Sequence, residues 1–178
     1  MKPNQSGAEF SIQECIAREA IREKQALYCR AVDRCDEQLL RSVYWPDATD
    51  NHGYFSGSID EFVGWVMPQL AQMESTHHQI GLPSILIEGP IAKVETYWTG
   101  YKRMKPGPDA RDHVSGGRYL DIMEQRGKEW RILRRLVVFD WSTTTGNYPW
   151  GGSGYPTPAA IDQRTIGQRA PNDKVYSL

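Results

Sequence analysis

The feature that most constrains the fold is a change in the period of the apolar residues near residue 75. Before this point apolar residues recur every three or four positions, as in Ile12, Ile16 and Ala20, which is typical of amphipathic helices. After it, segments such as SILIEG, GGRYLDIMEQ and EWRILRRLVVFDW favour strands. Helices followed by a run of strands predict an α+β domain, in which helices cover one side of a curved antiparallel sheet.

Capping residues indicate where the first two helices begin. Ser11 and Glu14 form a capping-box pattern that opens a helix over about residues 11–33. Asp36 is the candidate cap of a short second helix, which Pro46 prevents from continuing.

Turn signals divide the rest of the chain. The segment ATDNHGYFSG predicts a small hairpin, and a second capping box at Ser58 and Glu61 starts a third helix. A turn centred on Gly127 joins the last two strands into a long hairpin, whereas residues 102–117 are interpreted as a loop between strands.

The composition changes at both ends of the chain. Residues 1–10 are interpreted as an N-terminal arm, residues 11–145 as one domain, and residues 146–178 as an extension rich in glycine and proline. We expect this extension to wrap over the domain or to reach a partner subunit.

Charge and motif content exclude several classes of function. A net charge of −1 without a long basic run argues against a nucleic-acid binder, and no segment approaches the roughly 20 apolar residues of a membrane span. Three cysteines without a CxxC pair, and no apolar segment near the N-terminus, predict a cytoplasmic protein with reduced thiols. Because HxH, HExxH and nucleotide-binding glycine motifs are missing, we expect neither a metal nor another cofactor.

The segment LYCRAVDRCD places Tyr28 and Asp33 near the end of the first helix. On an ideal helix the two side chains point about 140° apart, so only a break at DRCD would bring both into one pocket. The alternative is that Asp33 pairs with Arg30 or Arg34 at the end of the helix.

The segment THHQ supplies a candidate base. Adjacent side chains of a strand face opposite sides, so only one of His77 and His78 can face the interior of the fold. A neutral imidazole can accept a proton near pH 7, and a carboxylate on its other nitrogen would orient it. A structural histidine with satisfied hydrogen bonds is the alternative.

The order of these motifs resembles the SnoaL-like branch of the nuclear transport factor 2-like superfamily over about residues 10–145. The resemblance implies a cone-shaped α+β barrel, similar to the cystatin fold, with a curved sheet wrapped around N-terminal helices. The combination of Tyr28, Asp33 and His77 is similar to bile-acid dehydratases, scytalone dehydratase and hexachlorocyclohexane dehydrochlorinase. It implies that His77 is the base, that Asp33 orients it, and that Tyr28 hydrogen-bonds an oxygen of the substrate.

Other polar and aromatic residues are candidates for binding substrate. Tyr54 resembles a pocket tyrosine of the dehydratases, with His52 as a rival for that role, and His113 is similar to a second histidine of scytalone dehydratase. Arg134 and Arg135 lie on opposite faces of the last strand, and which of them faces the pocket stays open. The full set that we expect to bind substrate is Tyr54, His52, His113, Arg134, Arg135, Tyr97, Tyr101 and Trp65.

The resemblance and the residues together predict a cofactor-independent lyase. We expect a dehydratase that removes water from a hydroxylated aromatic or polycyclic substrate. The same residues could release formaldehyde from an arylpropane diol or shift a double bond. A non-catalytic small subunit of an aromatic-ring dioxygenase and a binding protein for hydrophobic ligands are the alternatives. We expect a homo-oligomer, either a dimer or a trimer, because the last hairpin would leave apolar rows exposed on a monomer.

Overall fold

The computed structural model describes residues 9–105, 111–146 and 169–172. Within these ranges three helices and seven strands follow one another along the chain. They are α1 (Ile12–Arg34), α2 (Glu37–Ser42), β1 (Tyr44–Asn51), β2 (Ser56–Ser58), α3 (Ile59–Gln72), β3 (Met73–Ile80), β4 (Ser84–Glu88), β5 (Ile91–Met104), β6 (Arg111–Arg126) and β7 (Glu129–Gly146).

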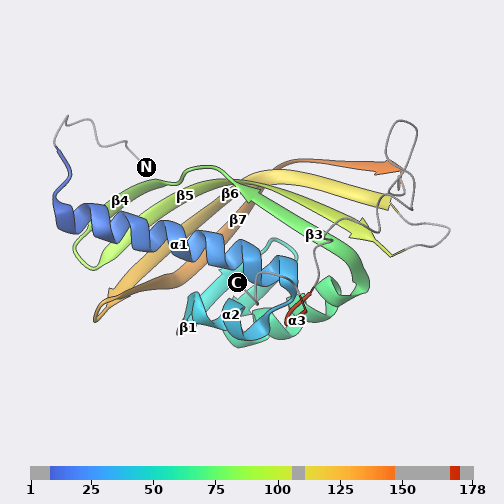
Figure 1. Ribbon diagram of the computed structural model, residues 1–178, viewed down its shortest axis with the longest axis horizontal. Helices are drawn as coiled ribbons and strands as arrows, with labels where there is room; N and C mark the ends of the chain where they lie inside the picture. Colours follow the sequence, from blue (N-terminus) through green and yellow to red (C-terminus); the bar gives the residue numbers. More distant parts are fainter. Residues whose placement is uncertain (1–8, 106–110, 147–168, 173–178) are drawn as a thin grey trace.

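The strands form one curved and open sheet in the order β2-β1-β7-β6-β5-β3, and β4 also pairs with β5. Figure 1 shows α1 lying across one face of this sheet, with α2 and α3 beside its C-terminal end. The expected α+β cone is confirmed, but the sheet does not close into a barrel. It is also mixed rather than purely antiparallel, because β1 runs parallel to β7.

The predicted loop at residues 102–117 is wrong at both of its ends, because β5 extends to Met104 and β6 begins at Arg111, while residues 106–110 lie outside the described residues. The two strands stay paired from Tyr101 opposite Val114 to Arg103 opposite Asp112. An ion pair of 2.8 Å between Arg103 and Asp112 joins the two strands there. The polar residues that suggested a loop are therefore part of the paired strands.

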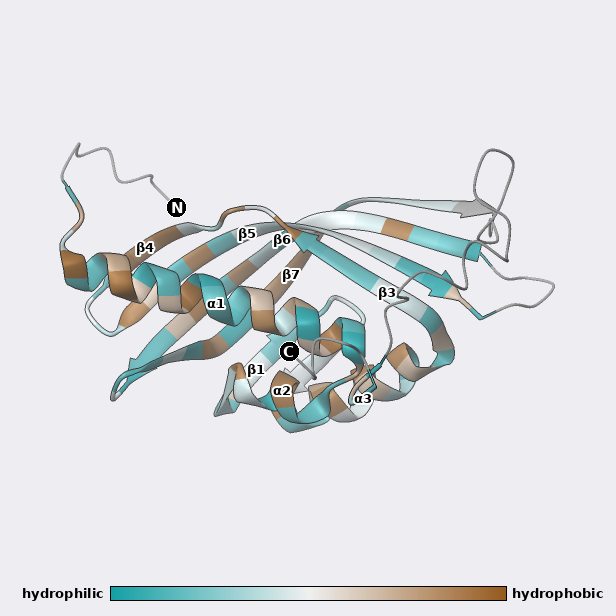
Figure 2. Ribbon diagram, in the orientation of Figure 1, coloured by the Kyte–Doolittle hydropathy of each residue, from teal (hydrophilic) through white to brown (hydrophobic). Residues whose placement is uncertain are grey.

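The predicted helix starts are confirmed by their caps. Ser11 accepts a hydrogen bond from the main-chain N–H of Glu14, Asp36 caps α2, and Ser58 forms a full capping box with α3. Figure 2 shows hydrophobic and hydrophilic residues alternating along α1, as an amphipathic helix requires. The helix continues through Asp33 to Arg34, so the break that we considered at DRCD does not occur before Asp33.

The inner face of the sheet buries the guanidinium of Arg135. Arg135 is 2% exposed and donates hydrogen bonds to Asp121, at 2.8 and 2.7 Å, and to Gln25 of α1 at 2.7 Å. Its guanidinium carbon lies 4.0 Å from the ring centroid of Tyr28 and 4.2 Å from that of Tyr119. Burial alone would lower the pKa of Arg135, but Asp121 holds it well above its usual value. Arg135 is therefore the arginine that faces inward and stays charged.

Within the described ranges, no helix combines the length and the apolar character that crossing a bilayer demands.

We predict that Asp121→Asn lowers the free energy of unfolding by about 3–5 kcal/mol, because it leaves a buried guanidinium without its anion. Urea denaturation followed by circular dichroism measures this change. Asp47→Asn is the matched control, since Asp47 pairs with Arg126 on the exposed surface and should change stability little. Equal losses in the two variants would show that Arg135 does not depend on Asp121.

Candidate functional site

The structure joins the end of α1 to β3 through one carboxylate. Oδ1 of Asp33 lies 2.6 Å from Nδ1 of His78, and Oδ2 of Asp33 accepts the main-chain N–H of His78 at 2.7 Å. The side chains of Asp33 and His78 are only 7% and 9% exposed. Both oxygens of Asp33 therefore bind the same residue, which fixes the imidazole relative to α1.

The prediction that His77 is the partner of Asp33 is wrong. The side chain of His77 is exposed, whereas Thr76 and His78 lie on the side of β3 that faces α1. Only one histidine faces inward, as strand geometry requires, but it is the second of the two. The physical reason is the register of β3 on β5, which places His78 opposite Gly100.

The charge of Asp33 determines which nitrogen of His78 is basic. Burial raises the pKa of Asp33, but hydrogen bonds from the ring and main chain of His78 and from Thr76 outweigh this effect and hold the pKa below its usual value. An ionised carboxylate only accepts hydrogen bonds, so the proton between the two residues lies on Nδ1. The lone pair of the imidazole is then on Nε2, which makes no hydrogen bond to a described residue.

Gly100 lets the imidazole of His78 pack closely against the main chain of β5. A Cβ atom added to Gly100 would lie 3.2 Å from both Cδ2 and Nε2 of the imidazole. The ring of Trp98, on the same face of β5, has its centroid 6.5 Å from that of His78. The basic nitrogen is thus surrounded by a bare main chain and an indole ring.

Tyr28 lies deeper in the same aromatic layer, without a direct contact to Asp33 or His78 within the described residues. Its ring packs edge-on against that of Tyr119, with 5.5 Å between the centroids, and the ring of Tyr119 stacks on that of Trp98, with 5.4 Å between the centroids. Burial raises the pKa of Tyr28 far above its usual value, and the charge of Arg135 only partly opposes this. The hydroxyl therefore stays protonated and can act as a donor.

Three donors on the inner face of the sheet have no partner among the described residues. They are Oγ1 of Thr96, Nε1 of Trp98 and Nη1 of Arg135, on side chains that are at most 5% exposed. Buried polar atoms are normally hydrogen-bonded, so this group of donors suits a ligand that brings oxygen acceptors.

A second histidine–aspartate pair lies on the inner side of β1. Nδ1 of His52 lies 2.6 Å from Oδ1 of Asp50, and Oδ2 of Asp50 accepts the hydroxyl of Tyr44 at 2.7 Å. The ring of His52 stacks on Phe62 of α3 with 4.9 Å between centroids. Asp50 is 1% exposed, so this pair is built into the core rather than onto a surface loop.

His52, rather than its rival Tyr54, belongs to this interior. Tyr54 is 94% exposed, at the turn between β1 and β2, and makes no side-chain contact with the core. Trp65 is half-buried and packs on Phe55, with ring centroids 5.2 Å apart, at the side of His52. The structure thus places Trp65 near the second histidine and leaves Tyr54 outside.

Tyr101 and His113 lie away from both pairs. The hydroxyl of Tyr101 donates to Asp112 at 2.7 Å, in the extended part of the β5–β6 hairpin. His113 is exposed, with Nδ1 at 3.0 Å from Oγ1 of Thr144 on β7. Tyr101 pairs with the outward-facing His77 and so points away from His78, whereas His113 is exposed on β6, two strands away from β3.

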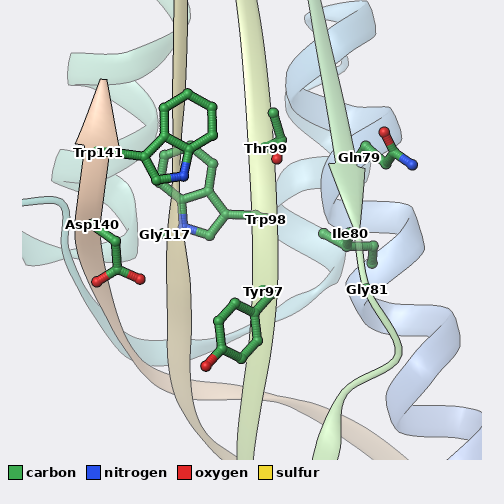
Figure 3. A pocket seen from close by; sticks show the side chains of 9 residues that line it. All are labelled: Gln79, Ile80, Gly81, Tyr97, Trp98, Thr99, Gly117, Asp140 and Trp141. Atoms are coloured by element: carbon green, nitrogen blue, oxygen red, sulfur yellow. The ribbon is translucent and has the colours of Figure 1, made fainter. Parts of the chain in front are cut away.

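Tyr97 and Arg134 lie on the outer face of the sheet. Tyr97 is 62% exposed and borders an open hollow of about 460 Å³ with Asp140 and Trp141, as Figure 3 shows. Arg134 is exposed and borders a neighbouring hollow with Leu136. Neither residue contacts the histidine pairs.

Association into a dimer or a trimer stays a prediction, and the exposed rings of this face agree with it.

The sequence could have signalled part of what the prediction missed. Asp50 stands two residues before His52, so the two side chains share a face of any strand. Gly100 and Trp98 carry no local signal of their own, because their role depends on the register of β5 with β3.

Comparisons with known proteins identify the family. The SnoaL-like domain family matches residues 13–136, which is more than half of the 178 residues. Among curated proteins, no significant sequence match is found.

Solved structures share the fold at low sequence identity. A proposed scytalone dehydratase from Novosphingobium aromaticivorans has a TM-score of 0.65 at 17% identity, covering 75% of this chain and 91% of that one. A hexachlorocyclohexane dehydrochlorinase from Novosphingobium barchaimii LL02 has a TM-score of 0.65 at 15% identity, covering 81% and 96%. A nuclear transport factor 2-like superfamily protein from Salmonella enterica has a TM-score of 0.64 at 15% identity, covering 80% and 99%.

The family match carries the assignment, and the solved structures agree with it in fold. The chain belongs to the SnoaL-like domain family.

Proposed function

We propose that the protein is a cofactor-independent lyase of the dehydratase type, in which His78 is the base and Asp33 orients it. The observation that carries the proposal is the oriented imidazole, whose Nε2 makes no hydrogen bond to a described residue and whose ring lies 6.5 Å, between centroids, from that of Trp98, one of the unpaired buried donors. The resemblance to a proposed scytalone dehydratase and a dehydrochlorinase supports a reaction that begins with removal of a proton from carbon.

In the proposed reaction, Nε2 of His78 takes a proton from a carbon next to an activating group of the substrate. The imidazolium that forms is stabilised by the ionised carboxylate of Asp33. The electron pair of the C–H bond becomes a carbon–carbon double bond, and the hydroxyl on the neighbouring carbon leaves. That hydroxyl takes up the proton carried by the imidazolium of His78 and departs as water, which returns His78 to its neutral form, so no redox partner is required.

The other groups act on the substrate oxygens. Tyr28 donates a hydrogen bond to the oxygen that gains charge, and His52, held by Asp50, takes the role that the sequence suggested for Tyr54. Thr96, Trp98 and Arg135 supply further donors. A flat hydroxylated aromatic or polycyclic substrate satisfies these donors and stacks on Trp98 and Trp65.

We predict that His78→Ala lowers kcat/KM by about 10²–10⁴-fold, because general base catalysis is lost. Asp33→Asn should lose a similar amount, and Tyr28→Phe about 10²-fold through loss of one donor. The assay is a panel of hydroxylated aromatics and polycyclic alcohols, followed by mass spectrometry for loss of water and by absorbance of the new double bond. An arylpropane diol with formaldehyde detection tests the carbon–carbon lyase.

His77→Ala is the matched control, because it removes the same side chain from the adjacent, exposed position. It should keep wild-type turnover. If His78→Ala turns over as fast as His77→Ala on every converted compound, His78 is not the base. A chain that binds these compounds but converts none is a binding protein instead.

We predict a second effect on stability at low pH. Because the pKa of Asp33 is lowered on folding, its charge stabilises the fold above its unfolded-state pKa, and this stabilisation is lost as the pH falls through the folded pKa. Between about pH 5 and about pH 3, the wild type should therefore lose more free energy of unfolding than Asp33→Asn. Urea denaturation at each pH measures it. Glu74→Gln, at an exposed carboxylate of the same strand, should retain the wild-type pH dependence.

A further inference from the structure

A short segment near the C-terminus binds directly behind Asp33. Nη1 of Arg169 donates to the main-chain carbonyl of Asp33 and, at 3.1 Å, to Oγ1 of Thr76, while Nη2 donates to the carbonyl of Leu70 at 3.1 Å. The N–H of Ala170 donates to the carbonyl of Arg34 at 2.7 Å. Figure 1 shows this segment, coloured red, beside the ends of α1 and α3.

These contacts complete the C-terminal end of α1. The last four carbonyls of a helix have no partner within the helix. The N–H groups that follow α1 satisfy the carbonyls of Ala31 and Val32. The next two carbonyls, those of Asp33 and Arg34, are satisfied by Arg169 and Ala170. The cap of the helix that carries Asp33 is thus formed by residues from the far end of the sequence.

The charge of Arg169 suits this position. Leu70 belongs to the last turn of α3, so one guanidinium lies at the C-terminal ends of two helices, where the helix dipoles favour a cation. The planar fork of arginine can reach carbonyls of both helices at once, which an ammonium cannot do.

Thr76 links Arg169 to the carboxylate of Asp33. A threonine hydroxyl can accept one hydrogen bond while it donates another. Oγ1 of Thr76 accepts from Arg169, and the same side chain hydrogen-bonds the carboxylate of Asp33. Arg169 therefore contacts Asp33 on its main chain and reaches its side chain through Thr76, which leaves both carboxylate oxygens facing His78.

We propose that Arg169 is a positioning residue that holds the carboxylate of Asp33 against His78, so that residues 169–170 form part of the active centre. The expected effect of Arg169 on catalysis rests on the proposed function, whereas its expected effect on the position of the carboxylate does not. A purely structural role is the competing explanation, in which Arg169 ties down the chain without affecting the geometry of the pair.

The decisive measurement is the proton NMR signal of the Nδ1–H of His78, which reports its hydrogen bond to Asp33 without any substrate. The signal is assigned by its absence in His78→Ala and its retention in His77→Ala. In Arg169→Ala it should shift upfield and broaden, and in Arg169→Lys it should change less. Arg131→Ala, which removes an arginine paired with Glu129 outside the site, should leave it unchanged.

Activity gives the second measurement. On any compound that the wild type converts, Arg169→Ala should lower kcat about 10–100-fold with little change in KM, since misplacement of a base affects the chemical step. An unchanged Nδ1–H signal in Arg169→Ala with a lowered Tm would overturn the proposal in favour of the structural role. If the alanine variant does not fold, Thr76→Val removes the link alone, and retention of the wild-type signal there would equally overturn it. Should the wild type convert no compound, the NMR result still decides the position of the pair.

Discussion

The structure depends on the buried guanidinium of Arg135. A charge without water must be matched by anions and hydrogen bonds, and here the partners of this β7 residue come from α1 and β6 at once. Tyr28 and Tyr119 both pack against the guanidinium, so the aromatic layer is ordered by the same charge. These contacts fix the rotation of α1 about its own axis, because only one face of the helix carries both Gln25 and Tyr28.

The position of α1 then determines where its last turn lies. A helix held near its middle by Arg135 extends over β3, where Asp33 meets both the ring and the main chain of His78. The Asp33–His78 pair and the Asp50–His52 pair differ in the group that the second carboxylate oxygen binds. In Asp33 it binds the same residue again, whereas in Asp50 it accepts the hydroxyl of Tyr44. His78 is therefore held by the end of α1, whereas His52 is held by Asp50 of the preceding strand β1 and by Phe62 of α3.

Local signals predicted the elements of the fold well, because caps and turns act over a few residues. Ser11, Asp36 and Ser58 begin helices as their side chains require, and the turn at Gly127 joins β6 to β7 with a positive φ of 63°. The choice between His77 and His78 could not be made in this way. It depends on the pairing of β3 with β5, which brings His78 opposite a glycine, and adjacent histidines carry no information about that register.

The same reasoning explains why Arg169 could not be found from the sequence. It lies 136 residues from Asp33, in a segment whose composition suggests only an extension. The helix ends in a Schellman motif, with Cys35 at a φ of 51° and hydrogen bonds from Asp36 to Ala31 and from Cys35 to Val32. This motif satisfies two of the last four carbonyls and leaves those of Asp33 and Arg34 to other partners. One of these carbonyls belongs to Asp33. A group that hydrogen-bonds this carbonyl therefore caps the helix and also restrains the residue that carries the carboxylate. A distant arginine can perform both only if the extension returns to the domain, which is where the structure places it.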